Sequence, residues 1–366
     1  MHNDHIYFNA INQIPQIGAR RFKKLLKYFE TMQEAWECSS AEFLKAGLDE
    51  KTITNFFEQR KKISPKKEWE KLVNEDIRFL TIQDEDYPKK LKELYDAPAC
   101  LYVRGEIKNT DDFALAVVGT RKISNYGKQV TPELSYALAQ QGITIISGLA
   151  LGVDAVAHAS AMRAEKGRTI AVLGGGVDNR SIYPRQNFQL AEKIIQEQRG
   201  AVISEYALGT TPRPENFPQR NRIISGLSLA TLVIEAPEDS GALLTARCAL
   251  EQNRDVFAVP GSIYNLNSIG PNNLIKMGAK LVVSAQDILE ELNLEKIEEF
   301  TKVRKIVPDT REEAEILKHL SREPLHIDKL VALTNLDSQS INSVLSLMEM
   351  KGKVKNLGGM QYVVCG

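Results

Sequence analysis

The chain has little of several features that define common protein classes. It has only four cysteines, Cys38, Cys100, Cys248 and Cys365, and no CxxC pair. This pattern disfavours a zinc site or a disulfide framework and predicts reduced thiols. No apolar run approaches the roughly 20 residues that span a bilayer, and the polar start MHNDHIYFNA is not a signal peptide. We therefore expect a cytoplasmic protein without membrane contact.

An excess of either charge is also absent, because 47 basic and 47 acidic side chains give a net charge of zero. That balance disfavours a protein that coats nucleic acid with a uniformly positive surface, so any nucleic-acid contact must be local. GxGxxG followed by an acid is missing, and so is GxxxxGK[ST]. A nicotinamide cofactor and P-loop hydrolysis are therefore disfavoured, and we expect neither a cofactor nor a metal.

With 366 residues the chain is too long for one ordinary core, and we expect three domains. Residues 1–75 show the pattern of short amphipathic helices, broken near Gly47. The pieces IPQIG and KAGLD resemble the turns of helix-hairpin-helix units, so this domain is interpreted as helix-hairpin-helix or SAM-like. A structural or protein-docking role and a DNA contact through the turn glycines are both open for it.

Residues 76–300 alternate apolar β-rich runs with helical stretches. The runs are FALAVVG, ITIISG, RTIAVLGGG, GAVISEY, ATLVIEA, DVFAVPG and AKLVV. Strands that are apolar on both faces and separated by helices are typical of a parallel, doubly wound sheet. The predicted fold class is therefore α/β, an extended Rossmann-like, mostly parallel sheet.

Residues 305–366 predict three helices followed by a hairpin across Gly358-Gly359. This combination indicates a winged-helix-like domain. Lys351, Lys353 and Lys355 alternate along the hairpin and are expected on one side of the wing. That arrangement suits DNA contact, but it is equally typical of a solvated strand, and winged helices also dock proteins.

Glycines cluster where the predicted strands end. They are Gly119, Gly148, Gly174, Gly175, Gly176 and Gly261, and Gly241 opens a helix. All strands of a parallel sheet end at one edge, where glycine lets main-chain N–H groups approach an anion near a helix start. Tight turns also need glycine for purely steric reasons. We expect a crevice suited to phosphate at this edge.

Two cations follow the first strand of the central domain, Arg121 and Lys122. Arg121 is predicted to clamp phosphate at the mouth of the crevice. The alternative for Arg121 is an ion pair with a crevice acid, Asp154 or Glu235.

Other polar residues near strand ends do not form an obvious catalytic set. Ser147, Ser204 and Ser240 lack a GxSxG elbow and a histidine partner, so we interpret them as hydroxyl donors to phosphate. His158 lies in the apolar helical run AVAHASA, where a core or helix-capping histidine is expected rather than a general base.

The segment TTPRPENFPQRNRIISGLS, residues 210–228, combines Arg213, Arg220 and Arg222 with Phe217. Its three prolines are expected to exclude a regular helix. Guanidinium groups bind phosphate, and an exposed ring stacks on any base, so such a loop suits single-stranded nucleic acid. The alternative is an ordinary arginine-rich turn with Phe217 in the core.

Taken in order, several stretches resemble the DNA-processing protein A (DprA/Smf) family, and they span most of residues 115–285. They are VVGTRKISNYG, IISGLALGVDAVAH, AVLGGGVD with IYPRQN, ISEY with FPQRNRIISGLS, VIEAPEDSGALLTARCAL, and VFAVPGSI with GPNNLIKMGA. One departure lies between Asp178 and Tyr183, where the spacer is longer than the family pattern.

The resemblance implies a non-catalytic recombination mediator of natural transformation. Such proteins bind and protect single-stranded DNA, form homodimers and load the RecA recombinase. The resemblance also implies that Phe217 stacks on a base, that Arg121 contacts phosphate, and that neighbouring side chains and main-chain amides hold the strand. The resulting nucleic-acid-binding residues are Gly119, Arg121, Lys122, Ser147, Gly148, Gly174, Gly175, Phe217, Arg220, Asn221, Arg222 and Gly241.

Two other functions stay open. The sheet also resembles lysine-decarboxylase-like enzymes that cleave the N-glycosidic bond of nucleoside monophosphates, although the stretch from Glu238 to Thr245 lacks the double glycine of their PGGxGT element. A sensor that binds a nucleotide and signals through its terminal domains is the third hypothesis.

Overall fold

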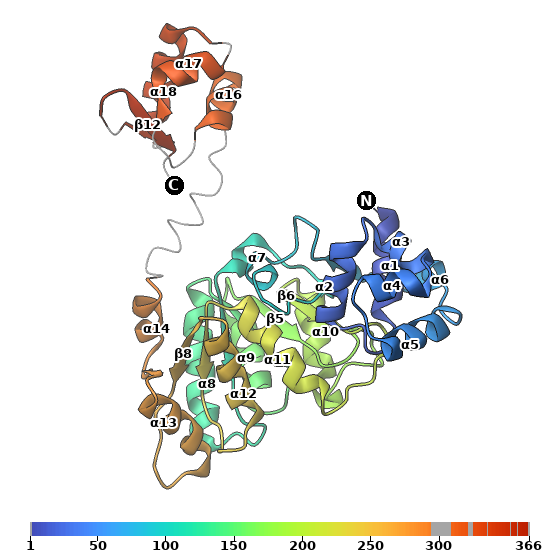
Figure 1. The fold of residues 1–366 in the computed structure, drawn as a ribbon. Helices are drawn as coiled ribbons and strands as arrows, with labels where there is room; N and C mark the ends of the chain where they lie inside the picture. Colours follow the sequence, from blue (N-terminus) through green and yellow to red (C-terminus); the bar gives the residue numbers. More distant parts are fainter. Residues whose placement is uncertain are drawn as a thin grey trace. The chain divides into compact units, whose positions relative to one another are not determined.

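The computed structural model describes residues 2–293, 309–320, 325–334, 336–351, 353–356 and 358–364. Figure 1 shows the two compact units into which the chain divides, Met1–Leu292 and Asn293–Gly366. The boundary expected between residues 300 and 305 and the thiol of Cys365 lie outside the described residues. Among the helices described, none combines the length and the apolar character that membrane crossing requires.

A nine-stranded sheet lies at the centre of the first unit, in the order β1-β2-β6-β5-β4-β3-β7-β8-β9. The seven strands β6, β5, β4, β3, β7, β8 and β9 are parallel to one another. Strand β2 pairs antiparallel with β6, and β1 pairs antiparallel with β2. Their bounds are β1 Arg78–Thr81, β2 Cys100–Gly105, β3 Ala114–Val118, β4 Thr144–Ser147, β5 Thr169–Val172, β6 Gly200–Ser204, β7 Ala230–Val233, β8 Asp255–Ala258 and β9 Lys280–Leu281. The predicted mostly parallel α/β sheet is confirmed.

Both faces of this sheet are buried, which explains the continuous apolar runs. In β5, Ala171 belongs to one buried cluster, whereas Ile170 and Val172 belong to another. Helices α9 and α10 contribute to the first cluster, and α7, α11 and α12 to the second. The helices of this region are α7 Lys89–Lys92, α8 Asn125–Gln140, α9 Val153–Arg163, α10 Phe188–Gln196, α11 Asn216–Leu227, α12 Gly241–Glu251, α13 Ile269–Lys276 and α14 Ala285–Glu291.

Strand β3 marks the point where the chain changes direction across the sheet. From β3 the chain adds β4, β5 and β6 on one side, and then returns through α11 to place β7, β8 and β9 on the other. Crevices form outside the carboxyl ends of the strands at such a switch point. The edge near β3, β4 and β7 is therefore where this fold places a ligand.

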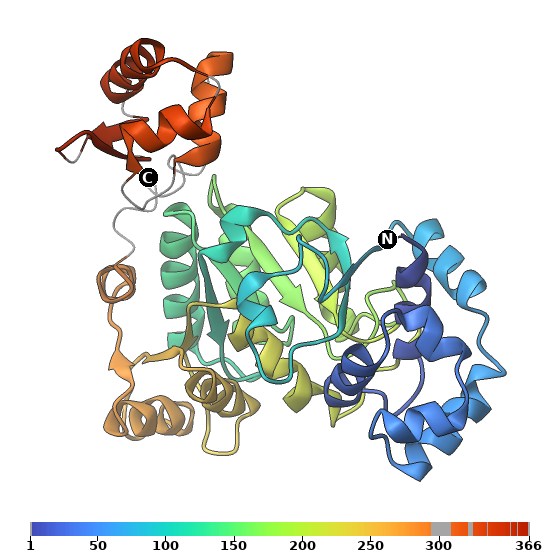
Figure 2. The ribbon, with the colours of Figure 1, turned by 45° about the horizontal axis from the view of Figure 1, so that its top comes forward.

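The N-terminal helices pack beside the sheet, as Figure 2 shows in blue. They are α1 His2–Asn12, α2 Ala19–Tyr28, α3 Met32–Glu37, α4 Ser40–Lys45, α5 Glu50–Arg60 and α6 Pro65–Asn74. The expected break at Gly47 lies between α4 and α5, and Gly47 has a φ of +82°. These helices share a buried cluster with the sheet, and the Tyr102 hydroxyl donates a hydrogen bond of 2.7 Å to Asn9. A domain boundary near residue 75 stays a prediction.

The second unit contains the predicted three helices and a hairpin. Its elements are α16 Arg311–His319, β10 Leu325–His326, α17 Ile327–Leu333, α18 Ser338–Met350, β11 Val354–Asn356 and β12 Gln361–Val364. The three strands pair antiparallel in the order β10-β12-β11. Ile316, Leu330 and Ile341 are fully buried between the helices. This unit therefore has a core of its own.

Candidate nucleic-acid interface

A cavity of about 680 Å³ opens where β3, β4 and β7 end. Gly119 and Arg121 follow β3, Asp154 follows β4, Gly241 follows β7, and Phe217 reaches the cavity from α11. We call this cavity the switch-point pocket, because it lies where the strand order reverses. The crevice predicted from the glycines is present at this edge, and phosphate binding there stays a prediction.

The Phe217 ring forms one wall of the switch-point pocket and is only partly buried. The guanidinium carbon of Arg121 lies 5.5 Å from the centroid of this ring, and the Tyr183 ring lies 6.1 Å from it. A Cβ atom on Gly174 would come within 3.0 Å of the ring, so the absence of a side chain there makes room for it. Phe217 is thus not buried in the core, and it offers a ring beside a cation.

Arg121 is exposed, and among the described residues it forms an ion pair with neither of the two acids considered for it. The Glu235 carboxylate accepts a hydrogen bond of 2.9 Å from the amide of Ser124. The Asp154 carboxylate accepts one of 3.0 Å from the amide of Gly148. The Arg121 charge is therefore available to a ligand in the pocket.

Helix α11 corrects the expectation that residues 210–228 contain no regular helix. The helix begins at Asn216 and contains Phe217 and Pro218 in its first turn. Proline is tolerated there because the first N–H groups of a helix have no intrahelical acceptor. Phe217 and the polar residues after it are consequently held on a helix instead of a loop.

Arg220 is buried beneath the pocket, with an exposed fraction of 4 %. Its guanidinium donates hydrogen bonds to the carbonyl oxygens of Gly148, at 2.9 Å, and Val172. Burial lowers the pKa of Arg220 to about 10, and the nearby Asp154 carboxylate opposes that shift. Burial likewise raises the pKa of Asp154, and Arg220 opposes it. The predicted phosphate contact is thus corrected to a supporting role, in which Arg220 ties α11 to the loops after β4 and β5.

The two residues after Arg220 line different cavities. Asn221 lines the switch-point pocket, but its side-chain amide donates a hydrogen bond of 3.2 Å to the carbonyl of Gly241. Arg222 lines a second cavity, of about 790 Å³, and forms ion pairs with Glu205 at 2.6 Å and Asp96 at 3.3 Å. Arg222 was predicted to hold the DNA backbone beside Phe217. This prediction is wrong, because the Arg222 side chain lies in the second cavity and not in the switch-point pocket.

Three of the predicted glycines are required by close packing. A Cβ atom would lie 2.6 Å from the Val153 side chain at Gly119, 2.4 Å from the Arg220 guanidinium at Gly148, and 2.8 Å from a carbonyl oxygen at Gly175. The steric alternative therefore explains these positions.

Gly241 differs from those glycines, because nothing lies within 4 Å of an added Cβ atom. It is the first residue of α12 and lines the switch-point pocket. Ser240 caps this helix, and its hydroxyl accepts a hydrogen bond of 3.3 Å from the amide of Ala242. The start of an 11-residue helix thus faces the pocket, where its partial positive charge favours an anion.

Two of the three serine hydroxyls that were predicted to contact phosphate form hydrogen bonds within the protein instead. Ser147 is fully buried and donates 2.6 Å to the carbonyl of Val117. Ser204 is also fully buried and donates 2.6 Å to the carbonyl of Gly175. The prediction that these hydroxyls contact phosphate is wrong, because both are fully buried and donate to main-chain carbonyl oxygens. Lys122 is exposed but does not line the switch-point pocket.

His158 is a core residue, as expected. It is fully buried, and its Nδ1 lies 2.6 Å from the hydroxyl of Thr169. Burial, together with the charge of Arg220, lowers the pKa of His158 to about 3. A neutral, buried imidazole is not placed to act on a ligand.

In the second unit, two of the wing lysines face acids of the same unit. The Lys351 ammonium lies 2.8 Å from Asp309 and 3.0 Å from Glu313. The Lys353 ammonium lies 2.9 Å from Asp309 and 2.5 Å from Glu313. The side chain of Lys355 lies outside the described residues. The structure therefore places two of the three wing charges in ion pairs.

Tyr183 is a pocket residue that the sequence patterns did not predict. Its side chain is 50 % exposed, lines the switch-point pocket and lies beside Phe217. A signal was present, since Tyr183 belongs to the IYPRQN stretch that contributes to the resemblance. Pro212 and Pro214 also line the pocket, so the proline-rich approach to α11 forms part of its rim.

Comparisons with known proteins agree with this architecture. The model of the DNA recombination-mediator protein A family matches residues 78–293, and that of the DprA winged helix domain matches residues 301–360. Protein Smf of Synechocystis sp. is 36 % identical over 397 aligned positions that cover 98 % of each chain. DNA processing protein DprA of Bacillus subtilis is 45 % identical over 217 positions, which cover 59 % of this chain and 71 % of that protein.

Two solved structures share the fold. DNA processing protein A of Streptococcus pneumoniae matches with a TM-score of 0.67 and 34 % identity, covering 78 % of this chain and 97 % of that one. DNA processing protein A of Helicobacter pylori, whose structure was described for its single-stranded DNA binding mode, matches with a TM-score of 0.53 and 32 % identity, covering 60 % of this chain and 96 % of that one. The predicted winged helix is confirmed, and the chain belongs to the DNA recombination-mediator protein A (DprA/Smf) family of DNA-processing proteins.

Proposed function

We propose that the switch-point pocket binds single-stranded DNA, with one base stacked on Phe217 and a neighbouring phosphate at Arg121. The observation that carries this proposal is the partly exposed ring with a guanidinium 5.5 Å from its centroid. Stacking on a ring and charge contact with phosphate are the two elements of sequence-independent strand binding. The H. pylori relative, which is 32 % identical, supports the same ligand.

The amide end of α12 completes the proposed site. Gly241 leaves open space at the first residue of this helix, so a phosphate oxygen can approach the main chain there. We propose binding rather than catalysis as the role of the pocket, because its buried polar groups, Arg220 and Asp154, hold loops in place.

Membership of the recombination-mediator family supports a further step. We propose that the protein acts in the cytoplasm as a homodimer, protects incoming strands during natural transformation and hands them to RecA. Sedimentation velocity tests the dimer. Assembly of RecA on DNA that is already covered by single-strand-binding protein tests the transfer, and an absence of acceleration by this protein would contradict it.

A length series of oligothymidine separates this proposal from a nucleotide sensor. A strand-binding pocket gains affinity with oligonucleotide length, whereas a sensor is saturated by a mononucleotide. If about four phosphates are contacted, the slope of log K against log salt is about −3. Incubation with nucleoside monophosphates tests the N-glycosidase alternative, because release of free base would establish that activity.

A further inference from the structure

Helix α2 of the N-terminal segment is strongly basic on its exposed side. Its sequence ARRFKKLLKY contains five cations and no acid. Arg21 forms an ion pair of 2.9 Å with Asp49, and the Lys24 ammonium donates to the carbonyl of Gly47. Arg20 and Lys23 are exposed and, within residues 2–293, neither forms an ion pair. The Lys23 ammonium donates a hydrogen bond of 3.3 Å to the carbonyl of Tyr95, so within these residues neither Arg20 nor Lys23 is neutralised by an acid.

Both of these charges lie over the ring of Tyr95. The Lys23 ammonium is 5.0 Å from the ring centroid, and the Arg20 guanidinium carbon is 5.7 Å from it. The Tyr95 side chain is nevertheless 74 % exposed, so its ring can accept a further stacking partner. An exposed ring beside cations that no described acid neutralises repeats the chemistry of Phe217 and Arg121 at a second place on the same unit.

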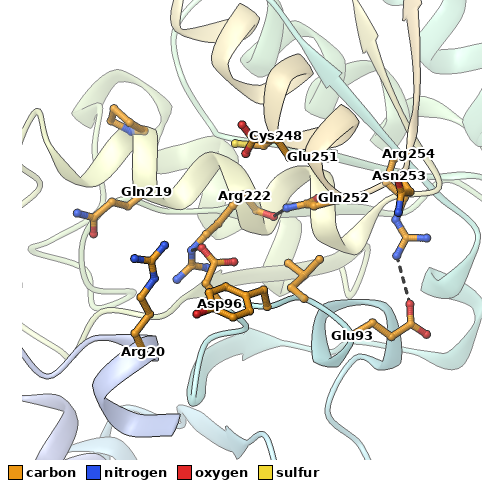
Figure 3. A pocket seen from close by; sticks show the side chains of 13 residues that line it. Arg20, Glu93, Asp96, Gln219, Arg222, Cys248, Glu251, Gln252, Asn253 and Arg254 are labelled. Atoms are coloured by element: carbon orange, nitrogen blue, oxygen red, sulfur yellow. Dashed lines mark hydrogen bonds and ion pairs between the residues drawn. The ribbon is translucent and has the colours of Figure 1, made fainter. Parts of the chain in front are cut away.

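Tyr95 and Arg20 line the second cavity, of about 790 Å³ (Figure 3). Figure 3 shows Arg20 extending from α2 toward Gln219 and Arg222 of α11. The other two arginines of this cavity are paired, Arg222 with Asp96 at 3.3 Å and Arg254 with Glu93 at 3.5 Å. Among the described residues that line this cavity, Arg20 of α2 is thus the arginine without an ion pair, and Glu251 is an acid without one.

The two cavities meet at the start of α11. Pro218 lines both of them and is exposed, and it directly follows Phe217. Gln219, also exposed, lines the second cavity. The exposed Pro218 therefore joins the linings of the two cavities, and Gln219 belongs to the same lining as Tyr95.

We propose that the single-stranded DNA site continues from the switch-point pocket over Pro218 to Tyr95, where a base stacks on the Tyr95 ring and phosphates contact Arg20 and Lys23. This inference rests on the proposed function of the first pocket and extends it. It assigns to the N-terminal helices a direct part in strand binding, through the side chains of α2.

Anisotropy with labelled oligothymidines of about 4 and about 16 nucleotides tests this extension on the full-length protein. Tyr95→Ala is expected to weaken binding of the long strand about 5- to 150-fold, and to leave the short strand unchanged, since the short strand fills only the Phe217 pocket. Tyr95→Phe keeps the ring and is expected to bind both strands like the unmodified protein. Arg20→Gln combined with Lys23→Gln is expected to reduce the salt slope for the long strand by about 1.4.

Lys66→Gln combined with Lys67→Gln is the matched control, because it removes two exposed charges from α6, outside both cavities. The extension is overturned if Tyr95→Ala binds the long strand normally, if it weakens both strands equally, or if the α6 control lowers the salt slope as much as the α2 variant does. Phe217→Ala tests the proposed function separately from the extension. If this variant binds both oligonucleotides normally, the proposed function is contradicted, regardless of the result for Tyr95→Ala.

Discussion

The Arg121 guanidinium lies over the Phe217 ring, with 5.5 Å between its central carbon and the ring centroid. One residue follows β3 and the other belongs to α11, so the fold alone brings them together. A cation–π contact of this kind at an exposed site stabilises by about 0.5 to 1 kcal/mol. It holds the Arg121 charge beside the ring on which, in the proposed site, a base stacks.

Phe217→Ala is expected to weaken binding of single-stranded DNA by about 1 to 3 kcal/mol, because it removes the stacking surface. Fluorescence anisotropy with oligothymidine measures the change. Phe217→Trp retains an aromatic face and is the control that should bind well. Unchanged affinity of the alanine variant would exclude this ring from the site.

Arg121→Gln is expected to lower the slope of log K against log salt by about 0.7, the contribution of one phosphate contact on a single strand. The same titration repeated at several salt concentrations measures it. Arg213→Gln serves as the control, since Arg213 is exposed in the same proline-rich segment but does not line the pocket. Equal slopes for the two variants would contradict a specific contact by Arg121.

Arg220→Met is expected to destabilise the first unit by about 1 to 3 kcal/mol, because buried acceptors that its guanidinium now satisfies lose their donor. Urea denaturation followed by circular dichroism reports the loss. Arg213→Met removes an exposed arginine and should leave the unfolding midpoint unchanged. A normal midpoint for Arg220→Met would show that Arg220 is not a supporting residue.

Gly241→Ala separates binding from stability. Its Cβ meets no atom within 4 Å, and alanine reduces the freedom of the unfolded chain, so stability is expected to rise by about 0.4 to 1 kcal/mol. Affinity for DNA is expected to fall, because the methyl group keeps phosphate away from the main chain of α12. Gly148→Ala is the contrasting variant and should destabilise, since its Cβ would lie 2.4 Å from Arg220. Unchanged affinity of Gly241→Ala would remove the helix start from the site.

His158 makes stability depend on pH. Its pKa is lowered by burial from the ordinary value of 6.5 to about 3, so the unfolded chain binds a proton below pH 6.5 that the folded chain does not. The stability contributed by the neutral imidazole is present above pH 6.5 and is lost as the pH falls toward 3. The slope is at most about 1.4 kcal/mol per pH unit for one proton. Urea midpoints between pH 7.5 and 5, compared with those of His158→Met, measure it, and parallel curves would contradict the assignment.

Much of the fold follows from local pattern. Strands buried on both faces have continuous apolar sequences, which is why FALAVVG and ITIISG predict β3 and β4 correctly. The three prolines of residues 210–228 predict no helix, but Pro218 lies in the first turn of α11, where proline is tolerated. The candidate site is less predictable, since Tyr183 lies in IYPRQN, a stretch with a family resemblance but no helical or strand periodicity that would place its side chain in a pocket.

The sequence by itself determined the order of strands and helices, the parallel sheet, and the presence of Arg121 and Phe217 near its carboxyl edge. Only the tertiary structure decided which polar side chains face the pocket. Arg220 is buried and donates a hydrogen bond to the carbonyl of Gly148. Arg222 lies in the second cavity and forms ion pairs with Glu205 and Asp96. The physical reason is that burial and partner choice depend on segments distant in the chain, and these decide whether an arginine charge is free to meet phosphate or is already paired.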